Sequence, residues 1–313
     1  MRLTRPQREL DGLFLAVFTI LIPFLTGGCA ASHTTARGPS GAPEPAQVAA
    51  KQDLIARFRR QAESVTSLNA SVTMILTAGS SYTGVIKQYH EIGGFLLAER
   101  PASIRVIGQA PIVGTNLFDM VSDGETFRIF IPSQHKFITG SANLERSSTK
   151  PIENLRPQHL TSVIFWTPIP DHTPVLMEEA NDETSRYYVV TVVRPASSLA
   201  SDREDWEIER RIWFDRSNLN VTRIETYEQG GQLASDVTLR GWDTFGTVKY
   251  PRQISLSRPD SDYQLQIGIK KATFNETIPA DRFILAQPPG TELVNAGTAP
   301  EPSAPAERPE KKN

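Results

Sequence analysis

The feature that most constrains the fold is a strict alternation of apolar and polar side chains along several segments. Near the end of the body of the chain, Tyr263, Leu265, Ile267 and Ile269 lie on one face, with Gln264, Gln266 and Lys270 on the other. Successive side chains of a strand point to opposite faces of its sheet, so this pattern indicates one buried and one solvated face. Sheets with one wet face are commonly antiparallel. The pattern therefore predicts a mainly antiparallel β fold.

The alternating segments follow one another through short links. Asp123-Gly124 and Gly230-Gly231 supply the turn residues for two tight hairpins. Strands and helices do not alternate regularly along the chain, which disfavours a Rossmann-like fold. We expect about eleven or twelve strands in one large antiparallel sheet or barrel. Thirteen segments are candidates for these strands: residues 71–77, 82–89, 103–109, 117–122, 126–131, 135–139, 174–179, 186–194, 206–214, 221–228, 232–240, 250–258 and 262–272.

Two segments carry a helical period instead. Between residues 50 and 65, apolar side chains recur at helical spacing and basic side chains occupy other faces. The second helix lies within residues 152–166, and Pro157 is expected at its start because proline is favoured at the first helical position. A mainly antiparallel sheet with two separate helices belongs to the α+β class.

The N-terminus has the pattern of an export signal, which we assign to residues 1–28. Three arginines precede an apolar run, and small residues lead up to Cys29. The run is shorter than the roughly 20 residues that span a bilayer. Small residues followed directly by cysteine resemble a bacterial lipobox, which implies cleavage before Cys29 and a lipid on its thiol. The alternative is an uncleaved anchor with an idle thiol. Ala30, in place of aspartate, implies the outer membrane by the same resemblance.

The two ends of the mature chain differ in composition from the body. Residues 29–49 and 288–313 are rich in Pro, Gly and small polar residues, so they cannot bury enough apolar surface to fold. We expect a flexible tether after the lipidated cysteine and a disordered Pro-rich tail. Residues 50–287 then form one folded domain.

Composition and motifs disfavour several classes of function. The chain has 33 basic and 35 acidic residues, without the basic excess that nucleic-acid binding requires. One cysteine makes no internal disulfide and no cysteine metal cluster. The five histidines lie outside any H-E-x-x-H motif, and no G-x-S-x-G, P-loop or G-x-G-x-x-G motif occurs. We expect no enzyme, no metal and no cofactor.

One link between strands is unusually apolar. Pro111, Ile112, Val113 and Gly114 place two β-branched side chains where a loop is normally polar. Both side chains could tuck under the sheet, the commoner fate of apolar loop residues. They could instead form an exposed finger that contacts lipid or a partner.

The residues around this link resemble those of LolA/LolB-type lipoprotein carriers and receptors. The run from Ser103 to Gly124 (SIRVIGQAPIVGTNLFDMVSDG) is similar to the core of that family, with a Pro-Leu-Gly loop between two strands. Residues 65–74 resemble its passage from helix to first strand, residues 121–132 a hairpin, and residues 208–215 a later strand. Val113 is an insertion relative to Pro-Leu-Gly, so either Ile112 or Val113 matches the loop leucine of the receptor.

The resemblance implies an unclosed half β-barrel of about eleven strands, with helices covering the open side and an acyl-chain cavity between them. It implies an outer-membrane lipoprotein on the periplasmic face that binds acyl chains of lipoproteins or lipids and helps to localise them. Residues 111–114 would touch membrane or cargo, and a periplasmic carrier protein is a possible partner. The alternative is a non-enzymatic envelope sensor or assembly subunit that uses the same scaffold for protein–protein interaction.

Overall fold

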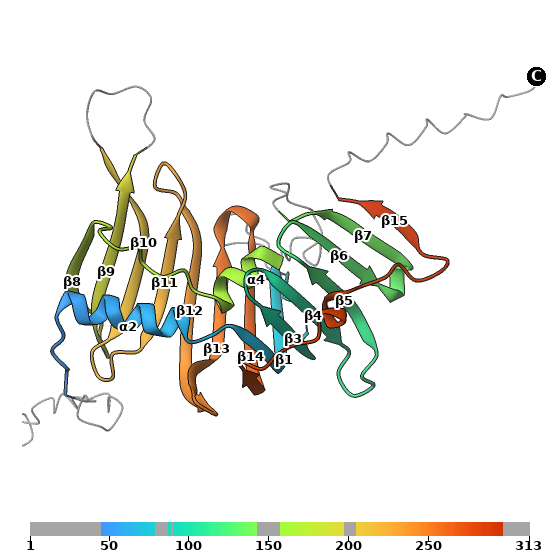
Figure 1. Cartoon of the computed structure of the whole chain (residues 1–313), viewed down its shortest axis with the longest axis horizontal. Coiled ribbons are helices and arrows are strands. Elements are labelled where there is room, and N and C mark those ends of the chain that lie inside the picture. The colour runs from blue at the N-terminus through green and yellow to red at the C-terminus, as the bar shows by residue number, and fades with distance from the viewer. Residues whose placement is uncertain (1–44, 79–86, 89, 143–156, 197–204, 297–313) are drawn as a thin grey trace, which may run out of the picture. The chain divides into compact units, whose positions relative to one another are not determined.

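Among the residues that the structure describes, fifteen strands form one unclosed sheet (Figure 1). The structure is a computed structural model that describes residues 45–78, 87–88, 90–142, 157–196 and 205–296. Within these residues the strand order is β15-β7-β6-β5-β4-β3-β1-β14-β13-β12-β11-β10-β9-β8, with β2 paired to β1. The two ends of this path do not pair with each other, so the sheet does not close into a barrel.

Two antiparallel meanders lie on either side of the central strand β1 (Ser67–Ala78). The first contains β3 (Ile92–Glu99), β4 (Ser103–Gln109), β5 (Asn116–Ser122), β6 (Thr126–Ile131) and β7 (Lys136–Ser141). The second contains β8 (Val175–Asn181), β9 (Arg186–Pro195), β10 (Trp206–Asp215), β11 (Val221–Tyr227), β12 (Leu233–Phe245), β13 (Val248–Arg258) and β14 (Tyr263–Phe274). The short strands are β2 (Lys87–Gln88) and β15 (Glu292–Asn295).

Two α-helices pack on one face of the sheet. They are α2 (Lys51–Glu63), which runs across the second meander, and α4 (Pro157–Ile164), which lies toward the first (Figure 1). Both begin and end close to the predicted positions, and α4 starts at Pro157 as expected. Short 3₁₀ turns follow β6 (Pro132–Gln134), β13 (Pro259–Ser261) and β14 (Ala280–Phe283). The mainly antiparallel α+β class is confirmed.

The sheet has more strands than the roughly eleven expected from strand patterns. Strand β3 was missed because its sequence, IGGFLLAE, is apolar without alternation and contains two glycines. Gly94 is required there, since a Cβ at this position would collide with the Ile107 carbonyl oxygen of β4. Of the strand expected over residues 82–89, the structure describes only β2.

The C-terminal segment also extends the sheet further than its composition suggested. Ser67 Oγ donates to the Glu276 carbonyl at 2.6 Å, and Arg105 Nη1 donates to the Arg282 carbonyl at 2.8 Å. The chain then forms β15, which pairs in parallel with the edge strand β7. Within the segment expected to be a Pro-rich tail, Glu292–Asn295 therefore form a strand on β7. The unpaired backbone groups of an edge strand explain this capture.

Candidate functional site

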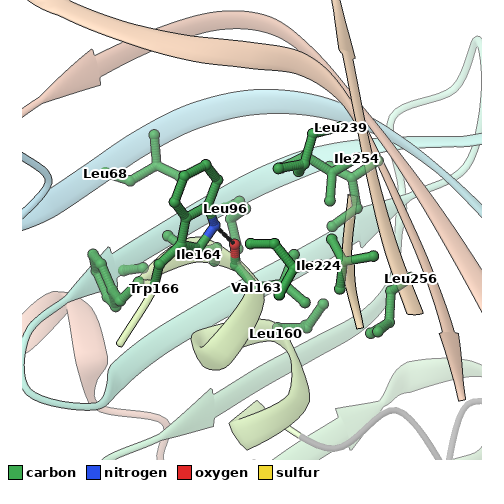
Figure 2. Packing of buried hydrophobic residues seen from close by; sticks show 14 of the residues in the cluster. Leu68, Leu96, Leu160, Val163, Ile164, Trp166, Ile224, Leu239, Ile254 and Leu256 are labelled. Carbon is green, nitrogen blue, oxygen red and sulfur yellow. Dashed lines mark hydrogen bonds between the residues drawn. The ribbon is translucent and has the colours of Figure 1, made fainter. Parts of the chain in front are cut away.

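The helices cover an apolar face of the sheet and fill the space above it with side chains. Figure 2 shows Leu160, Val163 and Ile164 of α4 beside side chains from the sheet. Phe58 of α2 stacks on Trp166, with ring centroids 5.5 Å apart. The residues of this layer are all buried: Leu54, Phe58, Ala62, Leu68, Leu96, Leu160, Val163, Ile164, Trp166, Ile224, Leu239, Ile254 and Leu256. Apolar side chains thus occupy the space where the resemblance implies a cavity.

Arg100 ties the end of α2 to the segment after α4. Its Nε donates to the Val65 carbonyl at 2.9 Å, and its Nη2 donates to the carbonyls of Ala62 at 2.9 Å and Trp166 at 3.3 Å. The last carbonyls of a helix lack partners inside the helix, so the guanidinium supplies one for Ala62. The guanidinium also lies 5.0 Å from the ring centroid of Phe165. The side chain of Arg100 therefore hydrogen-bonds both to the end of α2 and to the segment after α4.

Arg210 places a second cation inside the same layer. It is 7% exposed, and its Nη1 donates to the Thr167 carbonyl at 2.6 Å. Its guanidinium lies 5.7 Å from the Phe58 ring centroid, and the nearest carboxylate, Glu209, is 3.8 Å away. Burial lowers the pKa of Arg210, and the charge of Glu209 partly opposes this. A buried charge with so loose an ion pair weakens the packing of the layer.

Hydroxyl groups of the sheet hold α4. Tyr250 Oη donates to the Ile164 carbonyl at 3.2 Å, and burial raises the pKa of this phenol. Tyr263 Oη lies 2.7 Å from Nδ1 of His159. The Trp166 indole donates to the Val163 carbonyl at 3.1 Å, the dashed line in Figure 2. The helical layer is therefore attached by apolar packing and by a limited set of directional hydrogen bonds.

The loop between β4 and β5 presents its apolar side chains to solvent. Ile112 is fully exposed, at 106%, and Val113 is 70% exposed. Ala110 N donates to the Thr115 carbonyl at 2.9 Å, and Gly114 N donates to the Ala110 carbonyl at 3.1 Å, which closes a tight turn. Pro111 is exposed too. Of the two interpretations, burial under the sheet is wrong, and the exposed finger describes the geometry.

Ile112 is also strained. Its φ is 71°, in the left-handed region that a β-branched residue rarely adopts. Such a conformation costs on the order of 1–3 kcal/mol. Because the side chain makes no burial gain, nothing in the packing of the loop offsets this cost. A strained, fully exposed isoleucine is therefore a feature that stability alone does not account for.

The remaining predicted site residue, Cys29, lies outside the described residues. Among the residues described, no helix has the length and apolar character needed to cross a membrane. Nor do any three His, Cys, Asp or Glu side chains there come together as a metal site. Arg100 and Arg210 were not predicted from the sequence, since their partners are backbone carbonyls distant in the chain.

Comparison with known proteins found no sequence relative and several distantly similar solved structures. The sequence matches no protein-family model and no curated protein. Its structure is similar to that of a LolA superfamily protein from Nitrosomonas europaea, at 12% identity and a TM-score of 0.45, covering 76% of this chain and 99% of that one. A DUF1329 family protein from Desulfovibrio piger has 11% identity and a TM-score of 0.47, with 74% and 95% covered.

A third structure, described as an outer membrane lipoprotein-sorting protein domain from Vibrio parahaemolyticus, has 11% identity and a TM-score of 0.43, with 73% and 94% covered. Two of the three similar structures are described as LolA superfamily or lipoprotein-sorting proteins. At these TM-scores and identities they define no activity, ligand or partner for this chain.

Proposed function

We propose that this chain is an envelope lipoprotein, lipidated at Cys29, that binds acyl chains of lipoproteins or lipids and helps to deliver them to the outer membrane. Residues 29–49 tether the body to the periplasmic face of that membrane. Acyl chains bind on the apolar face of the sheet, beneath α2 and α4. The loop 111–114 makes contact with membrane or cargo, and a periplasmic carrier protein supplies the cargo.

The observation that carries this proposal is the exposed apolar loop. Ile112 and Val113 gain nothing from folding, because solvent surrounds them. Entry into lipid would contribute about 1.5–3 kcal/mol for each fully buried side chain. The strained backbone at Ile112 keeps its side chain pointing outward even though the protein would be more stable without it. Contact of the loop with an apolar phase would explain why Ile112 is exposed and its backbone strained.

Access to the sheet face requires the helical layer to move. The layer is attached through Arg100 and through the loosely paired Arg210, both of which bind backbone carbonyls. An acyl chain that enters would replace the apolar contacts of Phe58 and Leu160 with similar contacts of its own. Moving α2 and α4 off the sheet costs free energy because apolar surface becomes exposed. An acyl chain that covers this surface would recover part of that cost, at about 25 cal/mol per Å² of apolar surface covered.

The test is the double change Ile112→Glu plus Val113→Glu. Since both side chains are exposed, the melting temperature should stay close to that of the parent, whereas transfer of labelled lipid to liposomes should fall. The matched control is Leu176→Glu plus Ile284→Glu, which makes the same change at two apolar residues that are 65% and 61% exposed elsewhere. Transfer unaltered by the loop change, with stability also unaltered, would refute the role of the loop.

A second measurement separates this function from its alternative. Mass spectrometry of organic extracts of the purified protein should detect co-purified acyl lipids. The filled space under the helices favours the alternative, an envelope sensor or assembly subunit that binds protein partners and needs no cavity. A protein that extracts without lipid and transfers none in the liposome assay would support that alternative.

A further inference from the structure

A basic hollow of about 290 Å³ lies between α2, the β10–β11 turn and the β12–β13 hairpin. Arg57 and Arg60 line it from the helix, Lys249 and Thr247 from the hairpin, and Asn220 from the turn, with Trp242 also in its wall. We propose that this hollow binds a phosphate group, supplied by the headgroup of an anionic phospholipid of the membrane to which the protein is anchored. The site is separate from the acyl-binding face and needs no acyl binding, but it rests on the proposed anchoring of the chain at Cys29.

The charged side chains that line the hollow are all positive. Its lining contains three cationic side chains and no carboxylate. In the described part of the chain, none of the three takes part in an ion pair within 4 Å, whereas neighbouring Arg59 binds Asp171 at 2.6 Å. Asp53, one turn before Arg57, accepts a hydrogen bond from Ala50 N at the start of the helix. Three unpaired cations around one hollow favour an anion.

The walls of the hollow are fixed by hydrogen bonds that use a single donor of the three charged side chains, one of Arg57. Gln61 Nε2 donates to the Lys249 carbonyl at 2.8 Å, which joins the helix to the hairpin. Arg57 Nη2 donates to the Asn218 carbonyl at 3.3 Å, which joins the helix to the β10–β11 turn. Residues three apart on a helix share a face, so Arg60 projects on the same side as Arg57. Arginine pairs well with phosphate oxygens because its donors form a planar fork.

Trp242 gives the hollow an apolar component. Its indole donates to the Val221 carbonyl at 2.9 Å, and its ring meets that of Trp166 edge to face with centroids 6.0 Å apart. The ring is only half-buried. A phosphodiester carries carbon atoms beside its charged oxygens, and an indole surface next to three cations suits both parts of such a group.

The position of the hollow points to a membrane as the source of the phosphate. Gln47 N donates to the Arg216 carbonyl at 2.7 Å, and Gln47 Nε2 donates to the Ser217 carbonyl at 2.7 Å, in the same turn that lines the hollow. Gln47 lies 18 residues after Cys29. Eighteen residues extend over at most about 65 Å. Lipidation of Cys29, as proposed, would therefore keep the hollow within that distance of the membrane.

The test is calorimetric titration of the mature, full-length chain in a non-ionic detergent. The probes are dihexanoyl phosphatidylglycerol, dihexanoyl phosphatidylcholine and inorganic phosphate. The variant of the hollow is Arg57→Gln plus Arg60→Gln, with Lys249→Gln, at an exposed lysine, as a single alternative should the double variant be unstable. The control is Arg240→Gln plus Lys270→Gln, which removes the same charge from two exposed residues on the opposite face of the sheet.

Phosphatidylglycerol should bind the parent and the control alike, and the double variant about tenfold more weakly or worse, because charge-assisted hydrogen bonds are lost. Phosphatidylcholine, with its neutral headgroup, should bind more weakly than phosphatidylglycerol. Binding should also weaken with added salt. Inorganic phosphate that binds as tightly as the lipid would overturn the membrane as source and leave a soluble phosphate. Equal affinity of the parent and both variants of the hollow for every probe would overturn the site itself.

Discussion

Replacing Ile112 with glycine should stabilise the protein, although it removes a large side chain. Ile112 has a φ of 71°, which costs on the order of 1–3 kcal/mol for a β-branched residue, whereas glycine adopts it freely. No apolar burial is lost, because the side chain is 106% exposed. Glycine makes the unfolded chain more flexible, which removes about 0.4–1 kcal/mol of the gain.

The net gain in the free energy of unfolding lies between about 0 and 2.6 kcal/mol, with a central value of about 1.3 kcal/mol. For a domain of this size, that central value corresponds to a rise of about 3–5 °C in melting temperature. Scanning calorimetry or chemical denaturation would measure it. The same variant should transfer lipid to liposomes less efficiently, so that stability and function change in opposite directions.

Val113→Gly is the matched control, since Val113 is exposed but is not among the residues with positive φ. It should lower stability by about 0.4–1 kcal/mol through the unfolded state alone. If Ile112→Gly melts below the parent, or shifts in the same direction as Val113→Gly, the backbone strain assigned to Ile112 does not exist.

Three further changes test other parts of the molecule. Cys29→Ser should abolish labelling with a radioactive fatty acid and release the protein from the membrane fraction; persistent labelling would exclude Cys29 as the lipidated residue. Phe58→Ala should destabilise by about 3–5 kcal/mol, because a buried ring that stacks on Trp166 leaves a cavity, and a denaturation midpoint close to the parent's would show that the layer collapses to fill it. Asp123 accepts hydrogen bonds from Thr126 N at 2.7 Å and Glu125 N at 2.9 Å, which lower its pKa from the usual 3.8. Its stabilisation is therefore present above that value and lost as pH falls through the lowered pKa, so the stability advantage of the parent over Asp123→Asn should shrink in acid; an advantage constant from neutral to strongly acidic pH would contradict this.

The parts of the fold that the sequence predicts are those governed by local patterns. The helix that starts at Pro157 and the strand that begins at Tyr263 were both placed by periodicity. Strand β3 escaped because Gly93 and Gly94 interrupt its pattern, and the reason for Gly94 lies in a neighbouring strand. Strand β15 escaped because its pairing depends on an available edge rather than on its own composition.

The candidate site was predictable only in part for the same physical reason. The position of Ile112 between a proline and a glycine marked the loop, but whether the side chain is buried or exposed depends on the backbone conformation of the turn. Arg100 binds carbonyls of Ala62 and Trp166, which are 38 and 66 residues away in sequence, so no spacing rule could reveal the contact.

The pairing of β1 with β14 has a consequence for how the chain reaches its folded state. Leu68 lies opposite Phe274, so the centre of the sheet joins segments about 200 residues apart. Contacts of such long range are associated with slow folding. Until the residues of β14 are available, β1 exposes one bare edge, which is prone to pair with other chains. A nascent or truncated chain that lacks residues 263–274 would therefore depend on chaperones to avoid aggregation, whichever cargo the finished protein binds.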